Sequence, residues 1–215
     1  MNIPFVDLKA QYQSIKSEID LAIQNVINDT AFIKGKYVQK FEEEYAEAYG
    51  VKHVISCANG TDAIYITLKA LDIGHGDEVI TVANTWISTS ETITQAGARP
   101  VFVDIHPNYY TIDVSKIEEK ITKKTKCILP VHFAGRSCEM NEIVQIAKKH
   151  ELYIIEDCAH AIETEYHGKK AGTFGDFALS KQTKSAIPFC KCAVTHVLKE
   201  LYSSALIIRL VCCAG

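Results

Sequence analysis

Polar residues suited to binding or catalysis recur directly after short apolar runs. The run 51–57 leads into Asn59, Gly60, Thr61 and Asp62. Gly60 lets a ligand approach the backbone, Thr61 offers a hydroxyl, and a helix starting here would present free N–H groups to a phosphate. The alternative is an ordinary helix cap made by Asn59 or Thr61. The sequence contains neither GxxxxGK[ST] nor GxGxxG, so we expect no ATP or NAD cradle of those types.

A second candidate is the acid that follows the apolar run 153–156. A carboxylate such as Asp157 at the end of a buried strand is costly unless a cation meets it, and a protonated pyridine nitrogen is one such partner. A helix cap is the alternative. His160 could reach the same ligand, although a lone histidine is more often structural. Glu156 should point to the opposite face of the strand, which makes it the poorer candidate.

The only tryptophan, Trp86, follows the run 78–82. Its ring could stack on a flat ligand, but taken alone the position favours a buried core tryptophan. Asp104 and His132 also follow apolar runs, and we interpret both as residues that organise loops.

The spacing of apolar residues predicts the elements that carry these side chains. Residues 7–49 have helical spacing interrupted at Gly35, and short apolar strands then alternate with helices. This alternation predicts an α/β fold, a mostly parallel sheet sandwiched by helices, in which ligands gather at the carboxyl ends of the strands. The expected strands are 51–57, 78–82, 100–104, 127–131 and 153–156, and the expected helices are 63–71, 88–96, 114–121 and 140–150.

Composition narrows the class of protein. The 215 residues include 47% hydrophobic and 23% charged residues, with a net charge of −3, values ordinary for a globular protein that binds neither nucleic acid nor a membrane. No signal peptide or long apolar run is evident, so we expect a cytoplasmic protein. The cysteines form no paired CxxC motifs, so no metal site is expected. A metal-binding tail formed by Cys190, Cys192, Cys212 and Cys213 is a weaker alternative.

Nine ordered blocks of sequence resemble the sugar aminotransferases of the DegT/DnrJ/EryC1/StrS family, which are fold type I pyridoxal-phosphate enzymes. The resemblance extends from Ile3 to about Ala178. The blocks are IPFVDLKAQY, FIKGKYVQKFEEEYAEAYGVKHVI, NGTDAI, LDIGHGDEVIT, ANTWISTSETI, AGARPVFVDI, TKCILPVHFAG, YIIEDCAHA and HGKKAGTFGDFA.

The resemblance implies a fold of the aspartate aminotransferase type and a role for each candidate. Gly60, Thr61 and Asp62 would bind the phosphate of pyridoxal 5'-phosphate, and Trp86 would stack on its ring. Asp157 would pair with the ring nitrogen, and His160 would lie near the ring hydroxyl. The implied reaction moves an amino group from glutamate to a nucleotide-linked keto-sugar for surface polysaccharide or glycan biosynthesis. The active site would be completed within a homodimer.

The region of the cofactor-binding lysine departs from the family pattern. Family members follow Gly-Asp-Phe-Ala with Cys-Phe-Ser-Phe and then a Thr-Lys pair, whereas here Ser180 and the pair Thr183-Lys184 arrive early. By the resemblance, Lys184 is the lysine that bonds the cofactor as a Schiff base, with Lys181 as its rival. Ser180 is the candidate phosphate-binding serine.

These departures leave two functional hypotheses. We expect an N-terminal helical segment (1–35), a cofactor-binding large domain (36–189) and a divergent tail (190–215), with the family's small C-terminal domain missing. One hypothesis is an active aminotransferase. The other is a truncated, catalytically impaired homologue that keeps the fold and the ability to bind the cofactor.

Overall fold

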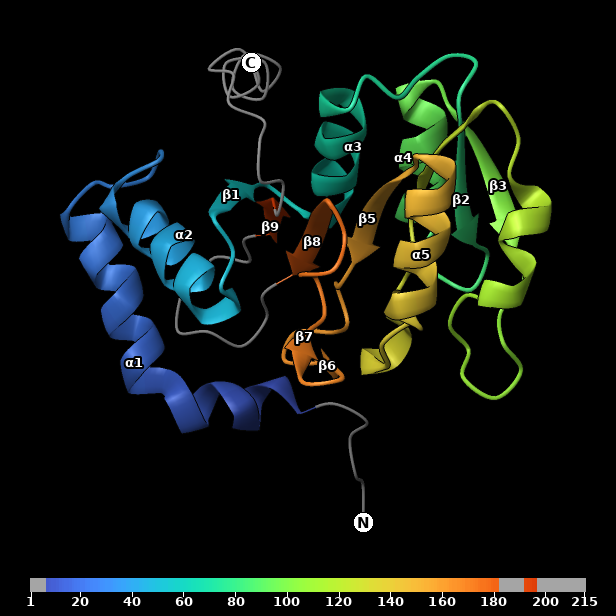
Figure 1. The fold of residues 1–215 in the computed structure, drawn as a ribbon. Helices are drawn as coiled ribbons and strands as arrows, with labels where there is room; N and C mark the ends of the chain where they lie inside the picture. Colours follow the sequence, from blue (N-terminus) through green and yellow to red (C-terminus); the bar gives the residue numbers. More distant parts are fainter. Residues whose placement is uncertain (1–6, 182–191, 197–215) are drawn as a thin grey trace.

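A mixed sheet organises the protein in the computed structural model, which describes residues 7–181 and 192–196 (Figure 1). Neighbouring strands follow the order β1-β9-β8-β5-β4-β2-β3. Strands β2 to β5 and β8 pair in parallel, and β9 is antiparallel to both of its neighbours. Every strand except β9 therefore has its carboxyl end at the same edge. The strands are β1 (His53–Cys57), β2 (Glu78–Val82), β3 (Arg99–Val103), β4 (Thr125–Ile128), β5 (Tyr153–Asp157), β8 (Phe177–Lys181) and β9 (Cys192–His196).

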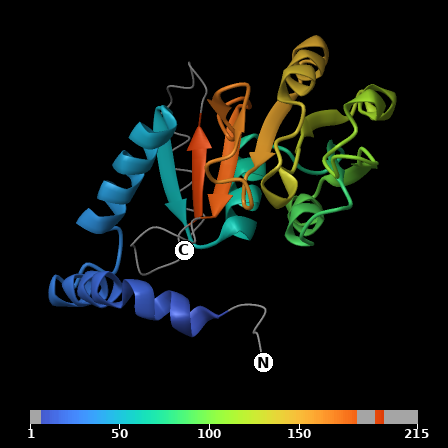
Figure 2. The same cartoon turned by 90° about the horizontal axis from the view of Figure 1, so that it is seen from below.

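Helices cover both faces of this sheet. Helices α3 (Gly60–Ala70) and α4 (Ser88–Ala96) pack against each other, and α5 (Met140–His150) lies on the opposite face from α4 (Figure 2). Helix α2 (Lys36–Tyr49) packs on β1. The predicted α/β fold, a mostly parallel sheet sandwiched by helices, is confirmed.

The core follows from the apolar runs in the sequence. All five residues of β2 are buried, as expected for a strand covered on both faces. A smaller cluster of Phe41, Tyr45, Val51 and Val54 joins α2 to β1. Alternate residues of β1 face opposite ways, so Val54 meets α2 while Cys57 packs against the main core that includes α3.

One predicted helix is wrong. Residues 114–121 form two short 3-10 turns, Val114–Lys116 and Glu118–Lys120. The carboxylate of Asp113 accepts both the N–H and the hydroxyl of Ser115, at 3.1 and 2.6 Å. These bonds cap the first turn, but the backbone is extended at Ile121, with φ of −73° and ψ of 129°, so no longer helix follows.

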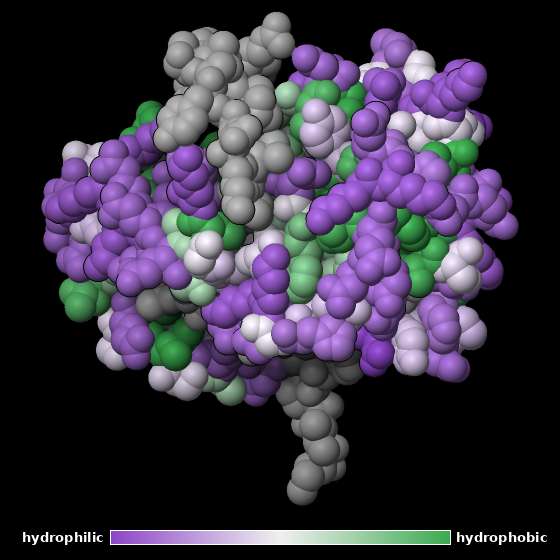
Figure 3. Space-filling model, in the orientation of Figure 1, coloured by the Kyte–Doolittle hydropathy of each residue, from purple (hydrophilic) through white to green (hydrophobic). Residues whose placement is uncertain are grey.

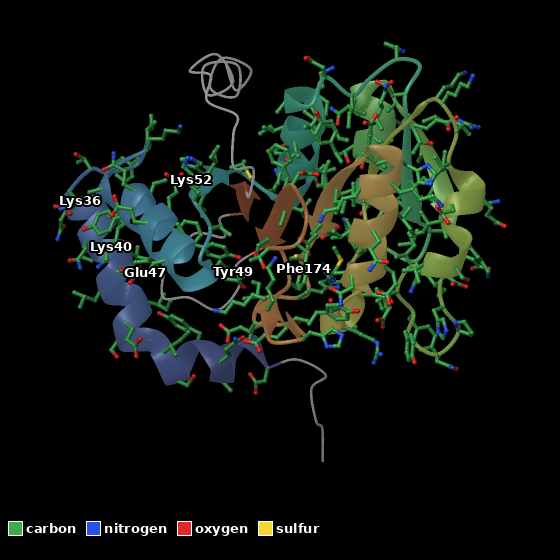
Figure 4. The ribbon with its side chains drawn as sticks, in the orientation of Figure 1. Lys36, Lys40, Glu47, Tyr49, Lys52 and Phe174 are labelled. Carbon is green, nitrogen blue, oxygen red and sulfur yellow. The ribbon has the colours of Figure 1, made fainter. Side chains whose placement is uncertain are left out.

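A hairpin that the sequence did not predict is fastened to the end of α2. It consists of β6 (Glu165–Tyr166) and β7 (Lys169–Lys170). The Lys170 ammonium donates to the carbonyl of Ala48 at 2.8 Å and lies 4.9 Å from the ring centroid of Tyr49. Tyr49 and Phe174 mark the two sides of this region in Figure 4. A cation at the carboxyl end of a helix is favourable, so Lys170 holds the hairpin against α2.

Helix α1 (Leu8–Asn28) differs from the others because only Val26 is buried along its length. Leu8, Tyr12 and Ile15 on its apolar stripe are 69%, 38% and 39% exposed. Figure 3 shows apolar groups over α1 on an otherwise largely hydrophilic face. Among the described residues, no helix has both the length and the apolar character needed to cross a bilayer.

The last described strand adds to the sheet from beyond the predicted domain boundary. β9 lies between β1 and β8, although its residues fall in the segment 190–215 that the sequence analysis assigned to a tail. The boundaries proposed at 35 and 189 stay predictions. Cys190, Cys212 and Cys213 lie outside the described residues.

Candidate functional site

The turn between β1 and α3 is built as an anion-binding helix start. Asn59 caps α3: its Oδ1 accepts the N–H of Asp62 at 2.8 Å, and its Nδ2 donates to the Asp62 carboxylate at 2.9 Å. The cap therefore occupies Asp62 through both its N–H and its carboxylate. The N–H groups of Gly60 and Thr61 donate to no other described residue. Two free amides at the positive end of the α3 dipole are the part of this turn that can receive a phosphate.

The first turn of α4 connects this phosphate turn to Asp157. The hydroxyl of Thr61 donates to that of Ser88 at 2.8 Å, and the neighbouring Thr89 hydroxyl donates to Oδ2 of Asp157 at 3.4 Å. Residues 61 and 157 thus contact two neighbouring residues in the first turn of α4. The sequence analysis placed Ser88 and Thr89 at the start of an expected helix and gave neither residue a role.

Asp157 is a buried carboxyl group at the end of the central strand β5. Its side chain accepts the N–H of Ala159 at 3.0 Å and the weaker bond from Thr89. No ion pair joins it to any described residue. Burial raises the pKa of Asp157 above its ordinary value, against smaller opposing effects of the Ala159 N–H, His132 and His160. A cation would relieve this cost, so the carboxyl group is suited to a positively charged ligand atom.

Glu156 has a different, structural task on the opposite face of β5. One of its oxygens accepts the N–H groups of Phe174 and Gly175, at 2.8 and 2.6 Å. The other accepts the N–H of Gly172 at 2.8 Å and lies 3.1 Å from Nε2 of His132. These bonds fix the loop that precedes β8, as the expected side-chain direction of Glu156 and the loop-organising role of His132 imply.

The same bonds argue against a metal at the buried cluster of His132, Glu156 and Cys158, whose ligand atoms lie within 4.8 Å of one another. Both oxygens of Glu156 are already engaged, and Nδ1 of His132 accepts the N–H of Cys138 at 3.0 Å. Burial raises the pKa of the Cys158 thiol to about 11, which leaves it protonated at neutral pH. A metal would have to displace several of these bonds and a proton.

A match to a known protein family covers most of the chain and includes these site residues. The model of the DegT/DnrJ/EryC1/StrS aminotransferase family matches residues 13–180. The chain belongs to this family.

Named relatives and solved structures agree with the assignment. The chain is 47% identical to a pleiotropic regulatory protein of Geobacillus stearothermophilus, over 83% of this chain and 48% of the relative. It is 46% identical to the dTDP-3-amino-3,6-dideoxy-alpha-D-galactopyranose transaminase of Aneurinibacillus thermoaerophilus, over 82% of this chain and 48% of that protein. The Bacillus subtilis NtdA structure, which contains the cofactor PMP, superposes with a TM-score of 0.85 at 30% identity, over 98% of this chain and 47% of that one. The chain thus spans about half the length of the curated relatives it matches.

Pyridoxal phosphate, the cofactor expected in this aminotransferase family, fits the residues present. The amides of Gly60 and Thr61 suit its phosphate, and the buried Asp157, which forms an ion pair with no described residue, suits its ring nitrogen. The contacts through Ser88 and Thr89 bring these two features together.

The two aromatic candidates both lie at the open edge of the site. Taken alone, the position of Trp86 favoured a buried core residue. That prediction is wrong, because Trp86 is 76% exposed. His160 is also exposed and lies in a turn rather than a helix, with the Ala161 N–H bonded to the Cys158 carbonyl. Both side chains are therefore accessible to a ligand beside Asp157.

The lysine region divides across the two faces of β8. Asp157 pairs with Leu179, so Ser180 lies on the opposite face of β8, where it is buried. Tyr45 of α2 interacts with Ser180, which agrees with that placement. Lys181 is the last residue of β8, two positions beyond Leu179, and its backbone pairs with Cys192 of β9. Lys184 lies outside the described residues.

Proposed function

We propose that this protein is a pyridoxal-phosphate-dependent aminotransferase acting on a nucleotide-linked keto-sugar. The observation that carries the proposal is the buried Asp157 carboxyl group, which forms an ion pair with no described residue and accepts a hydrogen bond from Thr89, the neighbour of the Ser88 that contacts Thr61. Family membership gives this arrangement its chemistry.

The residues of the chain divide the work of holding the cofactor. The Gly60 and Thr61 amides bind the phosphate, with Asp62 fixed in the Asn59 cap behind them. Asp157 would keep a proton on the ring nitrogen, and the exposed Trp86 and His160 would contact the ring. Pyridoxal phosphate supplies an aldehyde that accepts an amino group and a protonated ring that withdraws electrons. Lys184 would hold the cofactor through its amine and carry a proton to and from the substrate carbon, and Lys181 is the alternative lysine.

The substrates follow from the relatives. The names of three relatives contain UDP-, dTDP- and GDP-linked sugars. We propose glutamate as the amino donor and a keto-deoxysugar carried by a nucleoside diphosphate as the acceptor, used for polysaccharide or glycan biosynthesis. We further propose that the protein is cytoplasmic and that a homodimer completes the site.

Covalent trapping tests the role of the lysine. The protein is loaded with pyridoxal phosphate, reduced with borohydride and digested, and the labelled peptide is mapped. We expect the label on Lys184, loss of labelling in Lys184→Ala and retention in Lys181→Ala. A label on Lys181 assigns the role to the rival, and a label on neither residue overturns the enzymatic proposal.

Amino transfer is measured separately from cofactor binding. Glutamate should convert the bound cofactor to its amino form, and a panel of nucleotide keto-sugars should return it to the aldehyde form. Cofactor binding without either conversion would instead support the catalytically impaired homologue.

A further inference from the structure

A stack of three flat side chains lies in the loops after β3 and β4. The Tyr109 ring is 4.3 Å from that of His106, at an interplanar angle of 14°. The guanidinium carbon of Arg136 lies 4.1 Å from the Tyr109 ring centroid. Arg136 is exposed, and none of its guanidinium N–H groups is hydrogen-bonded or ion-paired to another described residue. The stack thus places over the Tyr109 ring a guanidinium whose donors make no bond to another described residue.

The loop that carries Tyr109 is held in one conformation. A bridge between Ile105 and Ile112 closes its base, and the His106 carbonyl accepts the N–H groups of Tyr109 and Tyr110 at 3.2 and 2.9 Å. Tyr110 has a φ of 61°, a strained value for a non-glycine residue. The Asn84 amide, from the loop that also contains Trp86, donates to the Tyr110 carbonyl at 3.4 Å. Strain kept by such bonds is frequent at binding sites.

The turn that carries Arg136 is attached to the strand of Asp157. The His132 N–H donates to the Asp157 carbonyl at 3.0 Å. Ala134 and Gly135 then take left-handed conformations with φ of 52° and 83°, and the Thr164 hydroxyl donates to the Gly135 carbonyl at 2.8 Å. Arg136 therefore projects from a fixed turn at the same edge of the sheet as the cofactor residues.

We propose that Arg136 binds a phosphate of the nucleoside diphosphate in the substrate, and that Tyr109 is its positioning residue. This inference rests on the proposed function, because it assigns one part of the same substrate. A planar guanidinium binds phosphate oxygens through two parallel hydrogen bonds, and stacking leaves little freedom to lose on binding. His106 supports the other face of Tyr109.

Nucleotide binding tests the proposal directly. UDP, dTDP and GDP are titrated into the pyridoxal-phosphate-loaded protein and monitored by calorimetry. Arg136→Ala should weaken binding of the preferred nucleotide by about tenfold or more, and Arg136→Lys, which keeps the charge without the fork, should fall between. Lys148→Ala removes an exposed positive charge from α5 and should leave the Kd within about twofold, since a distant surface charge is screened.

A second pair of variants tests the stack. Tyr109→Phe keeps the ring and should bind as the unaltered protein does, whereas Tyr109→Ala should weaken binding because the guanidinium is no longer fixed. Equal nucleotide affinities for Arg136→Ala and the unaltered protein would overturn the proposal. So would the absence of nucleotide binding by the unaltered protein.

The glutamate conversion separates this inference from the proposed function. Arg136→Ala should still bind pyridoxal phosphate, because the proposed contact is to the nucleotide and not to the cofactor. Loss of cofactor binding in Arg136→Ala would make the residue part of the cofactor site and overturn the inference. If glutamate fails to convert the unaltered protein but nucleotide binding still depends on Arg136, the aminotransferase proposal fails while the nucleotide site remains.

Discussion

At the scale of single residues, burial of the Asp157 carboxylate lowers the stability of the folded protein and would favour a bound cation. Burial raises its pKa above the ordinary value of 3.8, so the unfolded chain releases this proton at lower pH than the folded protein does. Without cofactor, Asp157 therefore makes the folded state progressively less stable as pH rises from about 3.8 through its raised pKa. This penalty is the reason that a cationic ring nitrogen would bind well there.

Asp157→Asn should separate the two effects. Without cofactor the variant should match or exceed the unaltered protein at pH 7, by up to about 1 kcal/mol in unfolding free energy, and lose less stability between pH 4 and 7. Its affinity for pyridoxal phosphate should fall about tenfold or more, because an amide cannot hold the ring proton electrostatically. Urea unfolding across pH and cofactor titration measure the two quantities. A cofactor-free variant less stable by several kcal/mol would indicate a purely structural Asp157.

At the scale of elements, the Glu156 carboxylate accepts backbone N–H groups of the loop 172–175, which lies outside the helices and strands. Three backbone N–H groups converge on it, and one belongs to Gly175, where an added Cβ would lie 2.7 Å from the Ile154 side chain. The loop therefore passes too close to β5 for any other residue type without a shift of the backbone.

Glu156→Gln should destabilise the protein by about 3 kcal/mol in unfolding free energy. The amide nitrogen would face a donor on one side, either the Gly172 N–H or the N–H groups of Phe174 and Gly175, and leave it unpaired. Glu163→Gln, at an exposed side chain in the turns that follow β5, is the matched control and should change stability by less than about 0.5 kcal/mol. Equal stabilities of the two variants in chemical denaturation would contradict this role for Glu156.

The elements themselves were largely predictable, but their side-chain contacts were not. The expected bounds of the strand 78–82 and of the helices 88–96 and 140–150 match the structure, because apolar periodicity and the left-handed Gly97 that ends α4 are local signals. The contacts of Thr61 with Ser88 and of Thr89 with Asp157 join residues 27 and 68 positions apart and depend on how α4 packs. The face of Ser180 depends on strand register counted from Asp157, and a single residue reverses it.

At the scale of the whole molecule, the sheet and α1 differ in how completely they are buried. The sheet and the helices that cover it could be inferred from the alternating apolar segments, since such segments must pack against one another. The partner of the α1 stripe could not be inferred, because periodicity shows only that a helix has an apolar face. Leu8 and Ile15 therefore leave apolar surface open, which favours association between molecules.

Replacing this exposed surface should reduce self-association without weakening the fold. Leu8→Gln with Ile15→Gln should shift the sedimentation distribution toward the monomer, while unfolding free energy changes by less than about 0.5 kcal/mol, because neither side chain is buried and glutamine favours helix. Val26→Gln, the same substitution at the buried position of this helix, should cost about 2 kcal/mol. If the double variant sediments as the unaltered protein does, α1 takes no part in association. If it unfolds as readily as Val26→Gln, the stripe is covered by contacts within the molecule.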